Sequence, residues 1–232
     1  MRINQFLAKA GLGSRRSCEQ LVLEGKVAVN GRVITSLAVS VTPADAVTVS
    51  HHKIEAARPI VLMLNKPKGV VCSTVAQDKR PTVFDLLPRK FPRLFHVGRL
   101  DADTEGLLIL TNDGELAQKM AHPKFKLPKI YFARLNRPFD FQSAPQFLKG
   151  FRIESGFGKF DSIYRLSLKE VKVTLTQGLK RQIRFMFAKG GYEVKELKRV
   201  QIGELKLGGL KPGQWKFLSD KEVNLLHACR LK

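Results

Sequence analysis

Hydrophobic positions at the start of the chain recur with helical spacing. Ile3, Phe6, Leu7 and Ala10 fall three or four residues apart, which places them on one face of a short helix. Ser14 is of a residue type that caps helix N-termini, and it predicts a second helix. The apolar face of that second helix is formed by Cys18, Leu21 and Val22. The pattern therefore predicts two short amphipathic helices.

A β-hairpin is predicted directly after these helices. Apolar runs at residues 27–29 and 32–34 flank Asn30 and Gly31, a dipeptide typical of type I′ turns. Residues 45–49 are predicted to form a closing strand. Together these elements predict a small N-terminal domain at residues 1–50.

The remaining pattern predicts a larger domain of mixed structure. Residues 51–59 have mixed polarity and end in proline, so we expect a linker there. Strands are predicted at 60–64, around 95–97, at 107–110 and within 200–207, and a helix at 183–188 with Ile183, Met186 and Phe187 on one face. No regular alternation of strand and helix is visible, which favours a largely antiparallel sheet. The predicted fold class is α+β, with the second domain at residues 60–232.

Composition adds a nucleic-acid partner to this picture. The chain has 232 residues, of which 44% are hydrophobic, so it can bury a sizeable core. Its formal net charge is +21, and residues 123–232 carry 24 basic and 9 acidic side chains, a net of +15. Such an excess of positive charge suits a polyanion. We therefore expect RNA or DNA to bind mainly to the C-terminal half.

Several other function classes are disfavoured by the sequence. No apolar run approaches the roughly 18 residues that a membrane span needs, and the start resembles no targeting signal, so a cytoplasmic protein without a membrane partner is expected. Cys18, Cys72 and Cys229 are scattered and are expected to be buried or free thiols. No metal site is predicted from them.

Three carboxylates lie close together between two predicted strands. They are Asp101, Asp103 and Glu105. A solvated loop, a Mg²⁺ site and a catalytic pair of carboxylates all fit this composition. The composition alone does not choose among these readings.

The motifs around these carboxylates resemble one family. Residues 98–101 (GRLD), 104–108 (TEGLL) and 111–114 (TNDG) look like the signature of the RsuA/RluF group of ribosomal RNA pseudouridine synthases. Further segments follow the order of that group: 66–69 (KPKG), 129–131 (KIY), 176–184 (TQGLKRQIR) and 197–199 (LKR). Gln177 and Phe185 differ from the residues that many members carry at these positions. The sequence of the motifs is more similar to the RluF-like branch, which acts on large-subunit ribosomal RNA.

The N-terminal segment resembles a known RNA-binding module. Residues 2–7 (RINQFL), 13–16 (GSRR) and 25–31 (GKVAVNG) are similar to the S4 domain. The resemblance implies that Arg15, Arg16 and nearby Lys9 contact RNA phosphates, which position a protein without reading sequence. We expect further RNA contacts from Arg99, Lys180, Arg181, Lys198 and Arg199.

The resemblance also assigns the chemistry. It implies that Asp101 isomerises uridine to pseudouridine without a metal or cofactor. Arg184 would keep that carboxylate ionised, because an opposite charge nearby favours the charged form. Tyr131 would stack on the target base, with its hydroxyl as a proton relay. Ile183 and Leu197 would form the walls of the base pocket.

Two other functions remain open at the level of sequence. One is a non-catalytic S4-type factor that binds ribosomal RNA during ribosome assembly. The other is a metal-dependent nuclease that uses Asp101, Asp103 and Glu105. Ribosomal RNA is the expected partner, transfer RNA is a further candidate, and the expected oligomeric state is a monomer.

Overall fold

The computed structural model describes residues 1–55, 57–73, 79–121 and 127–227. The chain forms two compact units. The first comprises Met1–Ile60 with Arg89–Leu94 and Asn112–Gly114, and the second comprises the rest.

The first unit is built from two helices, as the hydrophobic pattern predicts, and a four-stranded sheet. The helices are α1 (Ile3–Lys9) and α2 (Arg15–Leu23). The Ser14 hydroxyl accepts a hydrogen bond from the Ser17 backbone N–H at 3.0 Å, so the predicted cap of α2 is confirmed. The core of the unit contains Ile3, Leu7, Cys18, Val22, Val27, Val41 and Val47.

The predicted hairpin is confirmed, and the sheet contains one strand more than predicted. Asn30 and Gly31 both have positive φ, 50° and 79°, as a type I′ turn requires. The strands are β1 (Val27–Val29), β2 (Arg32–Ile34), β3 (Val47–Val49) and β4 (His52–Ile54), in the order β2-β1-β3-β4. Strand β4 lies inside the segment predicted as a linker. It pairs antiparallel with β3, because the turn between them brings its backbone N–H and C=O groups opposite the C=O and N–H groups of β3.

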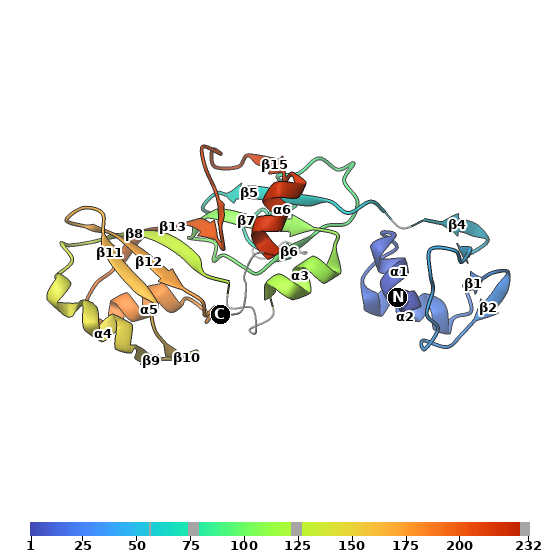
Figure 1. Ribbon diagram of the computed structural model, residues 1–232, viewed down its shortest axis with the longest axis horizontal. Coiled ribbons are helices and arrows are strands. Elements are labelled where there is room, and N and C mark those ends of the chain that lie inside the picture. Colours follow the sequence, from blue (N-terminus) through green and yellow to red (C-terminus); the bar gives the residue numbers. More distant parts are fainter. Residues whose placement is uncertain (56, 74–78, 122–126, 228–232) are drawn as a thin grey trace. The chain divides into compact units, whose positions relative to one another are not determined.

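The second unit is organised around a nine-stranded sheet (Figure 1). Its main order is β11-β12-β8-β13-β7-β5-β15, with β14 paired to β13 and β6 paired to β7. The strands are β5 (Val61–Lys66), β6 (Phe95–Val97), β7 (Glu105–Thr111), β8 (Lys129–Leu135), β11 (Ser162–Arg165), β12 (Glu170–Leu175), β13 (Val194–Ile202), β14 (Leu205–Lys206) and β15 (Trp215–Phe217). Of these pairings only β7 with β13 is parallel, so the predicted largely antiparallel α+β fold is confirmed.

Helices and a small hairpin cover the sheet of the second unit. They are α3 (Gly114–Ala121), the 3₁₀ turn η2 (Phe141–Ser143), α4 (Ala144–Lys149), α5 (Gln182–Lys189), α6 (Asp220–His227), and the hairpin β9 (Phe151–Ile153) with β10 (Gly156–Gly158). Ile183, Met186 and Phe187 are buried on α5, as predicted. Helix α3 was not predicted, since the Asn-Asp-Gly sequence before it indicated only a turn.

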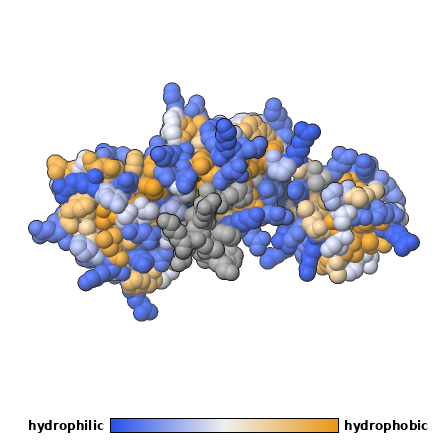
Figure 2. Space-filling view, viewed as in Figure 1, coloured by the Kyte–Doolittle hydropathy of each residue, from blue (hydrophilic) through white to orange (hydrophobic). Residues whose placement is uncertain are grey.

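Aromatic side chains pack α4 against α5. Phe147 of α4 and Phe187 of α5 lie with ring centroids 5.2 Å apart, and both contact Phe160 and Tyr192. Figure 2 shows hydrophobic patches at the end of the second unit that carries α4 and β11. The large hydrophobic side chains exposed in this part of the chain are Leu148, Phe157, Tyr164, Leu166 and Leu168.

Gly106 allows the two halves of the sheet to join. It pairs with Arg199 where β7 meets β13, and its φ is +119°. A Cβ atom on residue 106 would lie 2.2 Å from the Arg199 carbonyl oxygen and 2.6 Å from the Arg199 nitrogen. Only glycine lets two backbones approach this closely.

Candidate functional site

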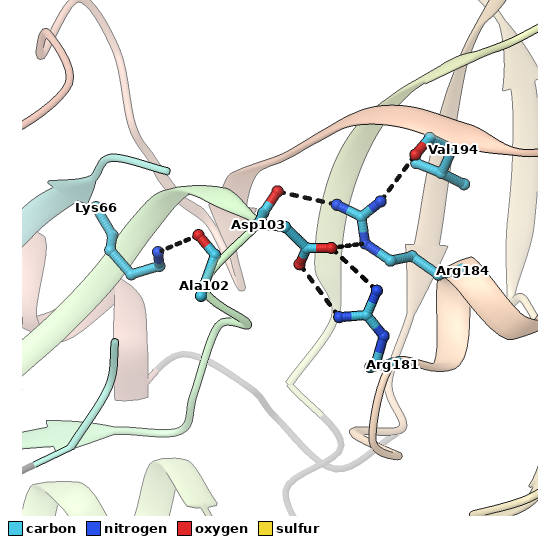
Figure 3. Close-up of polar contacts among 6 residues, drawn as sticks. All are labelled: Lys66, Ala102, Asp103, Arg181, Arg184 and Val194. Carbon is cyan, nitrogen blue, oxygen red and sulfur yellow. Dashed lines mark hydrogen bonds and ion pairs between the residues drawn. The ribbon is translucent and has the colours of Figure 1, made fainter. Parts of the chain in front are cut away.

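The loop at residues 98–104 carries Asp101 between β6 and β7, and an earlier turn holds it in place. The carbonyl of Ala102 accepts a hydrogen bond from Lys66 Nζ at 3.4 Å (Figure 3). It also accepts one from the Gly69 backbone N–H at 2.8 Å. The Thr104 N–H donates to the Asp101 carbonyl at 3.0 Å and closes a turn within the loop. The backbone at Asp101 and directly after it is therefore held by hydrogen bonds.

Lys66 is the buried cation behind this loop. Its side chain is 0% exposed, and Nζ also donates to the carbonyls of Pro67 and Val70, each at 2.8 Å. Burial lowers the pKa of the Lys66 ammonium, and nearby anionic groups, Asp101 among them, oppose that shift. The sequence motif at 66–69 contained this lysine, but a motif alone did not indicate that its ammonium group supports the loop.

Asp103 binds two arginines, and this differs from the predicted pairing. Arg181 reaches its carboxylate with Nη1 at 3.3 Å and Nη2 at 3.0 Å, and Arg184 Nε lies 3.2 Å from Oδ2 (Figure 3). The remaining Arg184 nitrogens donate to the backbone carbonyls of Asp103 and Val194. Arg184 was expected to pair with Asp101, yet no hydrogen bond or ion pair joins those two side chains among the described residues.

The difference has a geometric cause. Helix α5 begins at Gln182, directly after Arg181, whose left-handed backbone has φ 51°. The first turn of α5 therefore brings both guanidinium groups to Asp103. Burial lowers the pKa of Arg184, and the charges of Asp103 and, more weakly, Asp101 oppose that effect. Arg184 thus interacts with Asp101 electrostatically, without a direct contact.

A pocket of about 930 Å³ lies beside these groups. Its lining includes nine of the residues that the sequence indicated: Arg99, Asp101, Tyr131, Lys180, Arg181, Ile183, Arg184, Leu197 and Arg199. They come from the 98–104 loop, β8, α5 with the loop before it, and β13. The fold therefore gathers most of the predicted second-domain residues around one cavity.

The other predicted residues lie elsewhere. Lys198 is absent from the pocket lining and forms an ion pair with Glu105 at 2.7 Å. Arg15 and Arg16 are exposed and Lys9 is half-buried, all three in the first unit. The pocket belongs wholly to the second unit.

Tyr131 and Arg199 face each other inside the pocket wall. Their Cα atoms are partners across β8 and β13, so both side chains point to the same side of the sheet. Tyr131 is 8% exposed and Arg199 is 2% exposed. Arg199 was expected to contact RNA; its side chain is buried and forms part of the pocket lining.

The three carboxylates of the loop region do not converge. Asp103 faces its two arginines and Glu105 faces Lys198. Across the described ranges, no group of three or more His, Cys, Asp or Glu side chains is arranged to hold a metal ion.

Cys18 and Cys72 are buried free thiols, and Cys229 lies outside the described residues. In the same ranges, every helix is too short or too polar to cross a membrane.

Comparisons with known proteins agree with the arrangement of motifs. Residues 60–189 match a family described as RNA pseudouridylate synthase, and residues 1–47 match the S4 domain. The chain is 42% identical over 243 residues to a protein of Aquifex aeolicus named "Uncharacterized RNA pseudouridine synthase", with 100% of this chain and 96% of that protein covered. It is 38% identical over 233 residues to ribosomal large subunit pseudouridine synthase B of Bacillus subtilis, with 98% and 96% covered.

A solved structure shares the fold over nearly its whole length. The structure described as "Crystal structure of pseudouridylate synthase" superposes with a TM-score of 0.71 at 28% identity. The match covers 97% of this chain and 99% of that chain.

Proposed function

Because this chain belongs to the RNA pseudouridylate synthase family, we propose that it isomerises a uridine of large-subunit ribosomal RNA, with Asp101 as the catalytic carboxylate. One observation carries the proposal: the pocket gathers Asp101, Tyr131 and Arg184 from three separate elements around one cavity. The large-subunit substrate rests on the name of the Bacillus subtilis relative.

The reaction needs few groups. The bond from C1′ of the ribose to N1 of uracil breaks, and the ring reattaches through C5. An ionised aspartate can attack C1′, add to the base, or remove a proton from the sugar. The loop backbone holds Asp101 in the lining of the pocket, so each of these steps requires that the nucleotide enters the cavity.

Two fixed cations act on Asp101 in this proposal. Lys66 and Arg184 both interact electrostatically with Asp101, although neither bonds to it directly. Asp103 holds Arg184 in place, and the Ala102 carbonyl receives Lys66. A charged group that is fixed by its neighbours stabilises a carboxylate without having to reorganise.

The pocket walls suit a planar base. Tyr131 offers an aromatic ring, and Ile183 and Leu197 are apolar and buried beside it. Stacking on an aromatic ring contributes about 1–3 kcal/mol per base. Arg99 is exposed at the mouth of the pocket, where it can bind a phosphate or replace the extruded base.

The first unit is proposed to anchor the RNA away from the target base. Its exposed Arg15 and Arg16 lie on α2, in the part of the chain that matches the S4 domain. We propose that a monomer in the cytoplasm carries out the reaction. Transfer RNA remains a second substrate to be tested against ribosomal RNA.

The proposed function is tested by turnover and by genetic mapping. We expect the purified chain to release tritium from large-subunit ribosomal RNA containing 5-³H-uridine, with EDTA present. Transcripts of small-subunit ribosomal RNA and transfer RNA serve as controls for the substrate. Pseudouridine mapping of ribosomal RNA with and without the gene should reveal the site that is lost.

The outcomes separate the three functions. RNA binding without tritium release would favour a non-catalytic assembly factor. Strand cleavage that stops in EDTA would favour a metal-dependent nuclease. Tritium release from transfer RNA alone would contradict the ribosomal substrate while leaving the reaction intact.

The anchoring role predicts a change in salt dependence. Replacing both Arg15 and Arg16 by alanine should weaken RNA binding and make the slope of log affinity against log salt shallower by about 1.4–1.8, since each phosphate contact contributes about 0.7–0.9. Fluorescence anisotropy over a series of KCl concentrations measures this slope. The matched control replaces Lys26 and Lys53, which are ion-paired with Glu24 and Glu55 in the same unit. Equal slopes in both double variants would contradict the anchor.

A further inference from the structure

Arg199 is a buried cation with incomplete bonding. It lies near the middle of β13, and only 2% of its surface is exposed. Its Nε donates to the carbonyl of Leu107 at 2.7 Å, and its Nη1 donates to the hydroxyl oxygen of Tyr131 at 3.4 Å. Its Nη2 has no hydrogen-bond partner within the part of the chain that the structure describes.

This arrangement destabilises the free protein. Both partners of Arg199 are neutral groups, and no carboxylate forms an ion pair with it among the described residues. A cation removed from water without a countercharge costs several kcal/mol, and an apolar side chain of similar size would avoid that cost. A buried polar group left without a partner therefore calls for a functional explanation.

The contact with Tyr131 determines how that hydroxyl can act. A phenol has one hydrogen to donate, and its oxygen can accept. Since Arg199 has only donors, it must occupy the oxygen as an acceptor. The phenolic hydrogen then points away from the guanidinium. The Arg199 guanidinium carbon also lies 6.0 Å from the centre of the Tyr131 ring, at the outer range of a cation–π contact.

We propose that Arg199 is a positioning residue for Tyr131, which directs the phenolic hydrogen away from the guanidinium and stabilises negative charge on the phenolic oxygen. This inference rests on the proposed function and adds the group that handles the C5 proton. Lys66 and Arg184 do not fill this role, because Lys66 bonds to backbone carbonyls and Arg184 to Asp103 and Val194.

The proton transfers balance in this scheme. The C1′–N1 bond breaks and a C1′–C5 bond forms. The proton on C5 then passes to the Tyr131 oxygen as that oxygen releases its own hydrogen to water, and N1 takes a proton from water. Negative charge develops on the phenolic oxygen during this exchange, and Arg199 is the cation that touches it.

A double-mutant cycle tests the inference in the full-length chain. Arg199→Met should lower kcat by about 100-fold, within the range that a positioned proton-transfer group contributes, with little change in KM for RNA. Tyr131→Phe removes the hydroxyl through which Arg199 acts. In the Tyr131→Phe background, Arg199→Met should therefore lower kcat by no more than about threefold further. Losses that multiply would overturn the role.

An isotope effect provides a readout that a purely structural role would not change. With 5-²H-uridine RNA, Arg199→Met should show a larger deuterium effect on turnover than the wild type, because removal of the C5 proton becomes slower. Arg134→Met is the matched control: Arg134 is an exposed residue of β8 that is paired with Glu196, and its loss removes one positive charge from the same sheet. The control should keep the wild-type isotope effect.

A conservative variant provides a second test in case Arg199→Met misfolds. If Arg199→Met fails to unfold cooperatively, Arg199→Lys keeps the charge and enters the same cycle with Tyr131→Phe. A non-additive loss with Arg199→Lys supports the proposal, and an additive loss overturns it. Wild-type protein without turnover on any large-subunit RNA would overturn the proposed function itself. Additive losses in an active series overturn only the role of Arg199.

Discussion

Replacing Asp101 by asparagine is expected to lower pseudouridine formation by at least about 1,000-fold, because the neutral amide cannot act as a nucleophile or base. The shape of the side chain and its ability to accept hydrogen bonds are retained. The Thr104 N–H bonds to the backbone carbonyl of Asp101, so the turn should also survive the change. Tritium release from 5-³H-uridine RNA measures the loss.

Asp103→Asn is the matched control, since it makes the same chemical change two residues further along the chain. Asp103 is 45% exposed and binds Arg181 and Arg184, so its loss should lower stability. It acts on catalysis only through Arg184, so turnover should fall less than in Asp101→Asn. We expect the free energy of unfolding to fall by about 1–2 kcal/mol, because Arg184 is only 13% exposed and loses its carboxylate partner. Turnover that falls more in Asp103→Asn than in Asp101→Asn would show that the catalytic carboxylate has been misassigned.

Gly106→Ala is expected to lower the free energy of unfolding by about 3 kcal/mol or more, because backbone strain and direct overlap act together. A φ of +119° strains any residue with a side chain, and the new Cβ would lie 2.2 Å from the Arg199 carbonyl oxygen. Backbone atoms on a paired strand cannot move aside separately. Unfolding in denaturant measures the change, and turnover should fall with it because the 98–104 loop leads directly into β7.

Gly208→Ala separates strain from overlap. Gly208 also has a positive φ, +63°, but a Cβ there would meet nothing within 4 Å. Its replacement should cost about 1–2 kcal/mol, the usual penalty for a left-handed residue. Similar losses in the two variants would indicate that the close approach of β7 and β13 contributes nothing of its own.

Local features of the fold could be predicted from the sequence. The Ser14 cap, the Asn30-Gly31 turn and the apolar face of α5 each depend on residues that are close together along the chain. Strand β4 was missed because its stability comes from pairing with β3, and its own residues carry no strong strand pattern. The start of β13 was missed for a similar reason, since its first half is defined by pairing with β8.

The contacts of the site depended on tertiary structure. The motifs indicated the residues around the pocket, but the partner of Arg184 is decided by where α5 begins relative to Asp103. Lys198 and Arg199 were both expected to bind RNA. Because side chains alternate along a strand, neighbouring residues of β13 must point to opposite faces, and only Arg199 reaches the pocket. The opposite orientation of these two side chains can be predicted only once residues 194–202 are known to form a strand.

The hydrogen bonds on the Ala102 carbonyl leave the loop around Asp101 little freedom to change shape. Under the proposed function, a loop held in this way does not reach into an RNA helix, so we expect the rearrangement that brings a uridine to Asp101 to occur in the RNA. The free energy needed to unstack a given uridine should then contribute to the reaction rate. Substrate choice is therefore expected to depend on the local stability of the RNA as well as on its sequence, and a uridine in a loosely stacked loop should react faster than the same uridine inside a stable duplex.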